Sequence, residues 1–304
     1  MKPTVRVAFA NFWPSFTPDL FRARFPYVYE KYDLALSADP DVVFYSVFPP
    51  AHKQTSSWHI PQGNYVRVFI TGENAEPDMN MCEFALSFSR LINNPNHLRL
   101  PLWVYEARNW GYAPGRLVKS ANTDWEEVAS QKTEFCNFVY RHDVPFRNAI
   151  FSAVNAYKRV DAAGPCMNNM NGWRVPEQPY WQVVKIKFLQ RYKFTLAVEN
   201  AIWPGYSTEK LVDPMYVNSI PIYVGDPMLR RCFNPDSYID FSQFSVIKEM
   251  IERIREIDNN RDLYLKMLTA PFFHDNRVPT LARDETVMAF FDRVFAAALE
   301  RKPK

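Results

Sequence analysis

Lys210 occupies the first turn of a predicted helix, where a positive charge is unfavourable. A cation at that position faces the positive end of the helix dipole, at a cost of about 0.3–1 kcal/mol. A bound anion would reverse the sign, because the free backbone N–H groups and the ammonium would both point at it. For one lysine alone, a surface side chain that extends into water is the plainer interpretation. In either case, Lys210→Ala is expected to leave the fold intact or slightly more stable.

Residues 194–226 surround this lysine and predict a strand, a loop, a helix and a second strand. The apolar runs at 194–198 and 220–224 have the length of buried strands. Between them a Pro-Gly turn breaks the chain, and Ser207 or Thr208 can cap the helix. In a parallel sheet such a unit is right-handed, and its two strands end at the same edge.

Polar side chains follow the first of these strands and open the helix. Glu199 and Asn200 come directly after the strand, and Glu209 and Lys210 stand in the first helical turn. Ligands of parallel sheets bind outside the C-terminal ends of the strands. We therefore expect these four side chains to lie in one binding site.

The same stretch resembles the donor-binding motif of the alpha-1,3-fucosyltransferases of bacterial type, glycosyltransferase family ten. The matching residues are Phe194, Glu199, Asn200, Tyr206, Thr208, Glu209, Lys210 and the run 220–223. Such a string is far more specific than a single glycine motif. The resemblance implies an α/β protein of the GT-B fold, in which two Rossmann-like domains face each other across a cleft, and a GDP-fucose donor.

Arg147 is the candidate ligand for the donor phosphates. The chain has only 8 glycines and no GxGxxG or Walker motif, so side chains and helix ends must hold a nucleotide. A guanidinium suits phosphate because it donates paired hydrogen bonds. Residues 144–149 resemble the family segment whose arginine contacts the donor pyrophosphate. Without that resemblance, a surface ion pair is the plainer interpretation of Arg147.

Glu73 is the candidate general base. It lies in the sequence TGEN at 71–74, just past a predicted strand at 65–70. A carboxylate at the end of a strand can act as a base, although many such groups only cap helices or line loops. The family's TGEN motif is matched in full, and the resemblance therefore implies a catalytic role for Glu73.

The resemblance implies an inverting transfer of fucose from GDP-fucose to a hydroxyl, O3 in our expectation, of N-acetylglucosamine in an N-acetyllactosamine-type glycan. Glu73 would take the acceptor proton, while Arg147 and Lys210 would stabilise the charge on the departing GDP. The ribose, fucose or base would be held by Glu199, Asn200 and Glu209. Two alternatives stay open: a GT-B transferase of another nucleotide sugar, and a non-catalytic glycan- or nucleotide-binding protein on the same fold.

Composition argues against several other classes. The formal charge of +3 arises from 36 basic and 33 acidic residues without a long basic run, so nucleic-acid binding is not expected. The four cysteines lie far apart without a CxxC, and the five histidines lack metal-ligand spacing. The Asp39-Pro40-Asp41 sequence consists of turn residues before a strand. We expect no required metal, although Mn²⁺ or Mg²⁺ could stimulate the reaction.

The N-terminal sequence predicts neither a signal peptide nor a membrane anchor, because its first apolar run is short and soon interrupted. We therefore expect a cytoplasmic protein without a transmembrane segment, with peripheral attachment to the inner membrane as the alternative. A chain cut from an anchored parent would have the same sequence.

Strands alternating with helices predict a doubly wound α/β organisation. In the first half we expect a helix at 18–32 and mostly loop at 93–116. The predicted domains are an acceptor-binding domain at 1–132, a donor-binding domain at 133–280 and a C-terminal helix at 281–304 that crosses back toward the first domain. Four aromatic residues of the 93–116 segment could stack on a sugar ring or simply pack: Trp103, Tyr105, Trp110 and Tyr112.

Overall fold

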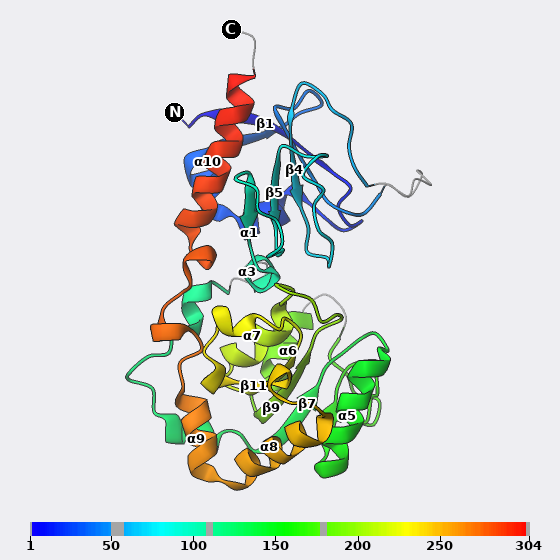
Figure 1. The fold of residues 1–304 in the computed structure, drawn as a ribbon, viewed down its shortest axis with the longest axis vertical. Helices are drawn as coiled ribbons and strands as arrows, with labels where there is room; N and C mark the ends of the chain where they lie inside the picture. Colours follow the sequence, from blue (N-terminus) through cyan, green and yellow to red (C-terminus); the bar gives the residue numbers. More distant parts are fainter. Residues whose placement is uncertain (1, 50–57, 108–111, 177–180, 302–304) are drawn as a thin grey trace. The chain divides into compact units, whose positions relative to one another are not determined.

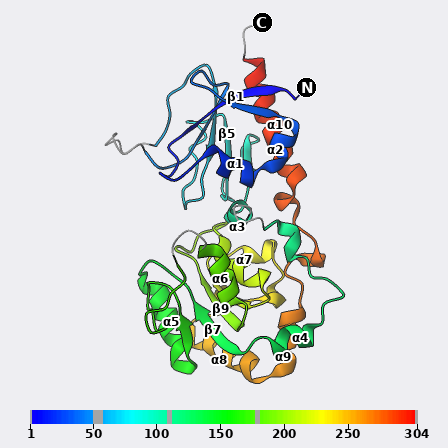
Figure 2. The same cartoon turned by 180° about the vertical axis from the view of Figure 1, so that it is seen from behind.

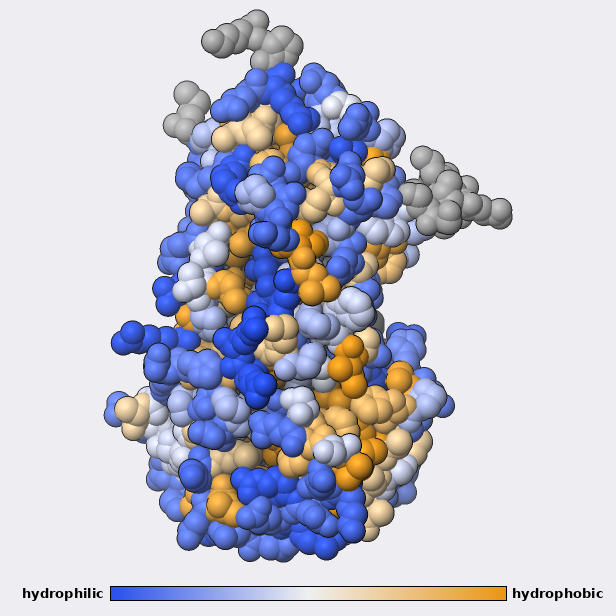
Figure 3. All heavy atoms as spheres, viewed as in Figure 1, coloured by the Kyte–Doolittle hydropathy of each residue, from blue (hydrophilic) through white to orange (hydrophobic). Residues whose placement is uncertain are grey.

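The computed structural model describes residues 2–49, 58–107, 112–176 and 181–301. The chain divides into two compact units (Figure 1). The first comprises Met1–Ala113 together with Thr280–Lys304, and the second comprises Pro114–Pro279. On the face seen in Figure 3, hydrophilic residues predominate and apolar residues form scattered groups.

The first unit is built on a six-stranded parallel sheet in the order β2-β1-β3-β4-β5-β6. Its strands are β1 (Thr4–Ala10), β2 (Asp33–Leu36), β3 (Val42–Tyr45), β4 (Val66–Ile70), β5 (Phe84–Ser87) and β6 (His97–Arg99). Every residue of β3, β4 and β5 is buried. Such continuous burial is typical of parallel strands that are covered on both faces.

Among its described residues this unit has four α-helices: α1 (Pro18–Arg24), α2 (Pro26–Lys31), α3 (Leu102–Ala107) and α10 (Asp284–Glu300). The C-terminal helix α10 lies beside α1 and α2 (Figure 2). The Phe291 ring of α10 lies 5.0 Å from the Phe25 ring and 6.0 Å from the Phe21 ring. These aromatic contacts attach the last helix of the chain to the core formed by its first residues.

Two expectations for the first unit were wrong. The helix expected at 18–32 is two helices, because Pro26 disfavours the helical conformation at Phe25 and starts α2. The expected loop at 93–116 contains β6 and α3. Both are short elements without a readable periodicity, and α3 is held by packing, since Trp103 and Tyr105 are each 1% exposed.

The second unit contains a five-stranded parallel sheet in the order β11-β10-β9-β7-β8. Its strands are β7 (Glu134–Phe138), β8 (Val160–Ala162), β9 (Tyr192–Val198), β10 (Ile220–Val224) and β11 (Ile239–Asp240). In the register of β9 and β10, Val198 lies beside Val224. Both strands therefore end at the same edge of the sheet, as predicted for residues 194–226.

The described part of this unit surrounds the sheet with six α-helices: α4 (Trp125–Ser130), α5 (Pro145–Tyr157), α6 (Trp181–Leu189), α7 (Glu209–Tyr216), α8 (Ile247–Asn259) and α9 (Arg261–Thr269). Helices α5 and α8 lie on one side of the sheet, and α6 and α7 lie on the other (Figure 1). Alternate residues of β9, Phe194, Leu196 and Val198, point into the core shared with α5 and α8. The opposite face of the sheet meets α6 and α7.

The unit boundary lies earlier than the sequence predicted. Residues 114–132 group with the second unit rather than the first. The Lys132 ammonium donates to the carbonyl oxygens of Gln190 and Val217, and Lys119 donates to those of Leu268 and Ala270. These lysines tie the segment to the second unit, and a sequence pattern cannot reveal such long-range contacts.

Asp258, at the end of α8, joins three elements of the second unit. Its side chain is 2% exposed and accepts hydrogen bonds from Lys158 at 2.8 Å and Lys193 at 3.0 Å. Lys158 caps the end of α5 and Lys193 lies in β9. Burial opposes ionisation of Asp258, but the bonds from the two lysines lower its pKa below the ordinary value. The charged carboxylate thus stabilises the packing of α5 and α8 against the sheet.

Asp258→Asn is expected to lower the free energy of unfolding by about 1–3 kcal/mol at neutral pH, because charged hydrogen bonds are lost. An acid with a lowered pKa stabilises the fold above its unfolded pKa and loses this contribution as the pH falls. The difference between variant and parent should therefore shrink below about pH 4. Urea unfolding at pH 7 and at about pH 3, with the exposed Glu252→Gln as control, measures this. A difference that is unchanged by pH would contradict the assignment.

Candidate functional site

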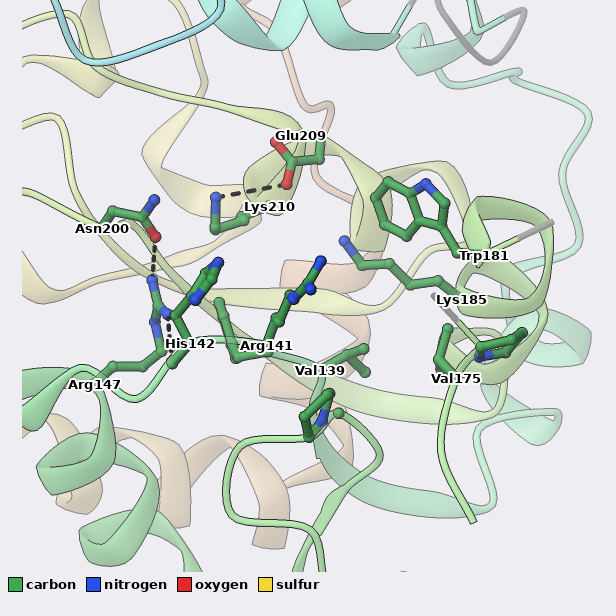
Figure 4. A pocket seen from close by; sticks show the side chains of 14 residues that line it. Val139, Arg141, His142, Arg147, Val175, Trp181, Lys185, Asn200, Glu209 and Lys210 are labelled. Carbon is green, nitrogen blue, oxygen red and sulfur yellow. Dashed lines mark hydrogen bonds and ion pairs between the residues drawn. The ribbon is translucent and has the colours of Figure 1, made fainter. Parts of the chain in front are cut away.

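A cavity of about 320 Å³ lies in the second unit, outside the C-terminal ends of β7, β8 and β9 (Figure 4). Its lining carries one acidic side chain, Glu209, and five basic or potentially basic ones: Arg141, His142, Arg147, Lys185 and Lys210. Apolar residues, among them Val139, Val175 and Trp181, line the remainder. This is the edge of the sheet at which parallel α/β proteins bind their ligands.

Lys210 is held by carboxylates and is not a free surface cation. Its ammonium lies 3.5 Å from Glu199 Oε2 and 3.5 Å from Glu209 Oε1, and it donates to Thr208 Oγ1 at 3.1 Å. Burial alone would lower the pKa of Lys210, but the Glu209 and Glu199 carboxylates raise it above its ordinary value. The surface interpretation was therefore wrong.

Glu199 explains why the lysine stands at the helix start. Its side chain is fully buried and accepts hydrogen bonds from the Thr208 backbone N–H at 2.7 Å and the Thr208 hydroxyl at 2.8 Å. Thr208 caps α7, which confirms one of the two predicted caps. Burial raises the pKa of Glu199, and Lys210 and Thr208 partly offset this effect. Removal of Lys210 would leave a buried carboxylate unpaired, so the expectation of an unchanged or more stable fold is reversed.

Glu209 is the acidic group that faces the cavity. Its side chain is 21% exposed, unlike that of Glu199. Burial opposes its ionisation, but the charges of Lys210 and Lys185 dominate and its pKa falls to about 2. Glu209 is therefore an anion at any physiological pH, and its oxygens can accept hydrogen bonds from hydroxyl groups of a ligand.

Arg147, on α5, is 1% exposed, so the surface ion pair considered from the sequence was wrong. Its guanidinium lies 4.1 Å from the centre of the Tyr140 ring, donates to the His142 carbonyl at 3.4 Å and donates to Asn200 Oδ1 at 2.5 Å. Its Nε is buried without a hydrogen-bond partner in the structure. The arginine thus fixes Asn200 and lines the cavity with donor groups.

Three predicted donor-binding residues, Glu199, Tyr206 and Thr208, are buried behind the cavity and do not line it; Tyr206 supports the backbone there. It is 4% exposed and is not among the residues that line the cavity. Its carbonyl accepts a hydrogen bond from the Tyr223 hydroxyl at 3.4 Å. Gly225 follows β10, and a Cβ there would lie 2.3 Å from the same hydroxyl and 2.5 Å from Glu199 Cγ. Tyr206 and Gly225 therefore support the closely packed backbone around Glu199.

Sequence reasoning missed a second buried ion pair beside the site. Lys185 Nζ lies 2.6 Å from Asp213 Oδ2, and Gln182 donates to Asp213 Oδ1 at 2.8 Å. Asp213 is 2% exposed. Burial raises its pKa, and the Lys185 charge opposes that shift. The signal was present in Gln182 and Lys185, two buried polar residues three apart on the mostly apolar α6, but their partner on α7 depends on the tertiary fold.

Glu73 lies in the first unit, whereas the predicted donor-binding residues lie in the second. It is exposed, and its backbone N–H donates to Thr71 Oγ1 at 3.1 Å. A Cβ on the neighbouring Gly72 would lie 2.7 Å from Glu106 Oε1, the mobile end of a side chain that packs against this loop. The TGEN loop is thus held in place while the Glu73 carboxylate stays accessible to a ligand.

The remaining candidates have structural partners. Asp39 and Asp41 both pair with Arg6, at 2.5 and 2.8 Å. Within the described part of the chain, no three His, Cys, Asp or Glu residues group as a metal site would require. Of the aromatic candidates, Trp103 and Tyr105 are buried, Tyr112 is half-buried, and Trp110 lies outside the described residues.

Over the described residues, no helix has both the length and the apolar character needed to span a bilayer. The four cysteines, Cys82, Cys136, Cys166 and Cys232, are buried free thiols.

Two family models match the chain, one in each unit. Residues 7–105 match the model described as Alpha-(1,3)-fucosyltransferase FucT N-terminal domain. Residues 128–273 match the model described as Glycosyltransferase family 10 (fucosyltransferase) C-term, and they include every predicted donor-binding residue.

Individual relatives agree with these models. The chain is 30% identical over 298 residues to the alpha-(1,3)-fucosyltransferase FucT of Helicobacter pylori, covering 88% of this chain and 60% of that protein. It is 38% identical to a putative fucosyltransferase of Acanthamoeba polyphaga mimivirus over 68% of this chain and 33% of the viral protein. The chain thus spans about three fifths of the length of the Helicobacter pylori protein and about one third of the length of the viral protein.

A crystal structure of an alpha1,3-fucosyltransferase with GDP-fucose superposes with a TM-score of 0.74 at 25% identity, covering 97% of this chain and 91% of that one. The chain belongs to glycosyltransferase family 10, the fucosyltransferases, and has the GT-B fold of two Rossmann-like α/β units.

Proposed function

We propose that the chain is an inverting alpha-1,3-fucosyltransferase that moves fucose from GDP-fucose to O3 of N-acetylglucosamine in an N-acetyllactosamine-type glycan. The observation that carries this proposal is the single cavity lined by Arg147, Asn200, Glu209 and Lys210. The Helicobacter pylori relative is named an alpha-(1,3)-fucosyltransferase, and a similar crystal structure of an alpha1,3-fucosyltransferase is described with GDP-fucose.

The positively charged side chains of the cavity suit the diphosphate of a nucleotide sugar. Permanent cations from Arg141, Arg147, Lys185 and Lys210 face one carboxylate, Glu209, among the lining residues. Guanidinium and ammonium groups in a partly dry site bind phosphate oxygens strongly. Arg147 and Lys210 would contact the pyrophosphate. Glu209 would accept hydrogen bonds from ribose or fucose hydroxyls, and Asn200 would accept hydrogen bonds from them or donate hydrogen bonds to them.

The two sides of the cavity differ in their side chains, and this difference predicts how the nucleotide lies in it. Trp181, Lys185 and Val175 lie on one side of the cavity, and Arg147, Asn200 and Lys210 lie on the opposite side (Figure 4). A purine ring is an apolar, planar group that packs against aromatic and aliphatic side chains. We therefore place guanine toward Trp181 and the pyrophosphate and fucose toward Arg147.

The transfer step needs a base and a stabilised leaving group. The acceptor hydroxyl would attack fucose C1 from the face opposite the GDP, and its proton would go to the Glu73 carboxylate. The bond between C1 and the β-phosphate oxygen would break, leaving its electron pair on GDP. Arg147 and Lys210 would stabilise that charge electrostatically. In this proposal, the first unit provides the acceptor-binding surface around Glu73.

GDP is expected to raise the melting temperature of the protein, because a ligand that binds only the native state stabilises it. At a GDP concentration about 100 times its Kd, the stabilisation would be about 2.7 kcal/mol. UDP, which carries the same diphosphate but a smaller base, should have a much smaller effect. Thermal shift titrations with both nucleotides test this, and equal shifts would refute the choice of guanine.

Lys210→Ala is expected to weaken donor binding and to lower the free energy of unfolding by about 1–3 kcal/mol, since Glu199 then remains buried without its cation. Loss of the lysine raises the Glu199 pKa further, so the penalty should shrink as the pH falls and the carboxyl group takes a proton. Melting curves at several pH values and GDP titrations measure both effects. Lys248→Ala, at an 85% exposed side chain, is the control. A variant as stable as the parent would contradict the buried pair.

Glu73→Gln keeps the side-chain shape and removes the base. Turnover of GDP-fucose onto an N-acetyllactosamine acceptor should fall by about 10²–10⁴-fold, the usual contribution of a general base. GDP binding should stay nearly unchanged, because the proposed donor residues lie in the other unit. Asp78→Asn, another exposed carboxylate of the same segment, is the matched control. A Glu73→Gln variant that transfers fucose at the parental rate would show that the base lies elsewhere.

A further inference from the structure

We propose that His142 is a ligand of the donor pyrophosphate whose protonation couples donor binding to pH. This inference rests on the proposed function, since it assumes that the cavity holds the diphosphate of a nucleotide sugar. Neither the sequence motif nor the match to the family's donor-binding residues assigned a role to this histidine.

The position of His142 is determined by the arginine that lines the same wall. Its backbone carbonyl accepts the 3.4 Å hydrogen bond from Arg147, and the next residue, Asp143, accepts a hydrogen bond from Asn148 on α5. The loop between β7 and α5 is thus fixed at both residues. The His142 ring points into the cavity beside Arg147 and below Lys210 (Figure 4). It is exposed, so a ligand and solvent protons can both reach it.

The groups around the histidine determine what it can bind. The charged side chains on the elements that form this cavity and its immediate surroundings are Arg141, Asp143, Arg147, Lys185, Glu199, Glu209, Lys210 and Asp213. Four of these eight are cations and four are carboxylates. Glu199 and Glu209 are paired with Lys210, Asp213 is paired with Lys185, and Asp143 is bonded to Asn148. Of these carboxylates Glu209 alone lines the cavity, beside the four cations, so the cavity surface favours an anion, and a charged imidazolium would add a further donor to it.

Proton coupling follows from the chemistry of the two partners. Imidazole is the side chain whose charge changes between pH 5 and 8. A diphosphate that is esterified at both ends keeps a constant charge over this range, unlike the terminal phosphate of GDP, which titrates near pH 6. A pH dependence of GDP-fucose binding must therefore come from the protein. If the imidazolium contacts the anion, binding becomes tighter as the pH falls, and binding near pH 6.5 takes up protons.

The experiment is isothermal titration of GDP-fucose into the whole chain, without acceptor, at pH 5.5, 6.5 and 8.0. We expect the affinity of the parent to rise about five- to tenfold from pH 8.0 to pH 5.5. At pH 6.5, titrations in two buffers of different ionisation enthalpy should show proton uptake. In His142→Gln both the pH dependence and the proton uptake should disappear. Melting curves of this variant confirm that it is folded at each pH.

His274→Gln is the matched control, because this exposed histidine of the second unit lies outside the cavity and contacts the Arg230 carbonyl. It should retain the full pH dependence. A folded His142→Gln variant that keeps the pH dependence would overturn the inference and point to Glu199, the carboxyl group beside Lys210 whose pKa is raised by burial. A parent that binds GDP-fucose equally well at all three pH values would also overturn it, while leaving the proposed function intact. A parent that binds no GDP-fucose at any pH would instead refute the proposed function.

Discussion

The site depends on the burial of one carboxylate, Glu199, at the end of a central strand. Removing a carboxylate from water costs several kcal/mol, so its partners must be supplied by the surrounding structure. Thr208 supplies two hydrogen bonds and Lys210 supplies the charge. Because both partners belong to the start of α7, the buried carboxylate fixes where that helix begins. The loop between β9 and α7 must then return to Glu199, and Gly225 allows β10 to pass close by.

This arrangement turns an electrostatic cost into a set of oriented charges at the proposed donor site. Lys210 neutralises Glu199 inside the protein and pairs with Glu209 at the cavity surface. Lys185, held by Asp213, adds a second positive charge that keeps Glu209 ionised. The charged groups are therefore oriented before a ligand arrives. Such preorganisation is the main source of stabilisation for charge that develops during a reaction.

Much of the second unit was predictable because its elements have strong local signals. The run at 220–224 is fully apolar and forms β10 at those positions, and Thr208 has both the residue type and the place of a helix cap. The weak elements of the first unit were not predictable. Helix α3 has six residues and strand β6 has three, too few for a periodic pattern. Pro26 divides the segment 18–32, which was expected to form one helix.

We could read from the sequence alone the family, the alternation of strands and helices, and the motif residues around Glu199 and Lys210. These follow from local patterns and from a contiguous motif, which a single chain displays directly. Whether each charged side chain is buried, and what it contacts, depends instead on how the chain packs. Lys210 appeared as an unfavourable cation because the helix dipole is a local effect, whereas its pairing with Glu199 arises from a contact made when β9 and α7 pack together. Lys185 and Asp213 are 28 residues apart and meet for the same reason. Long-range electrostatics depends on distances between chain segments, and folding alone establishes those distances.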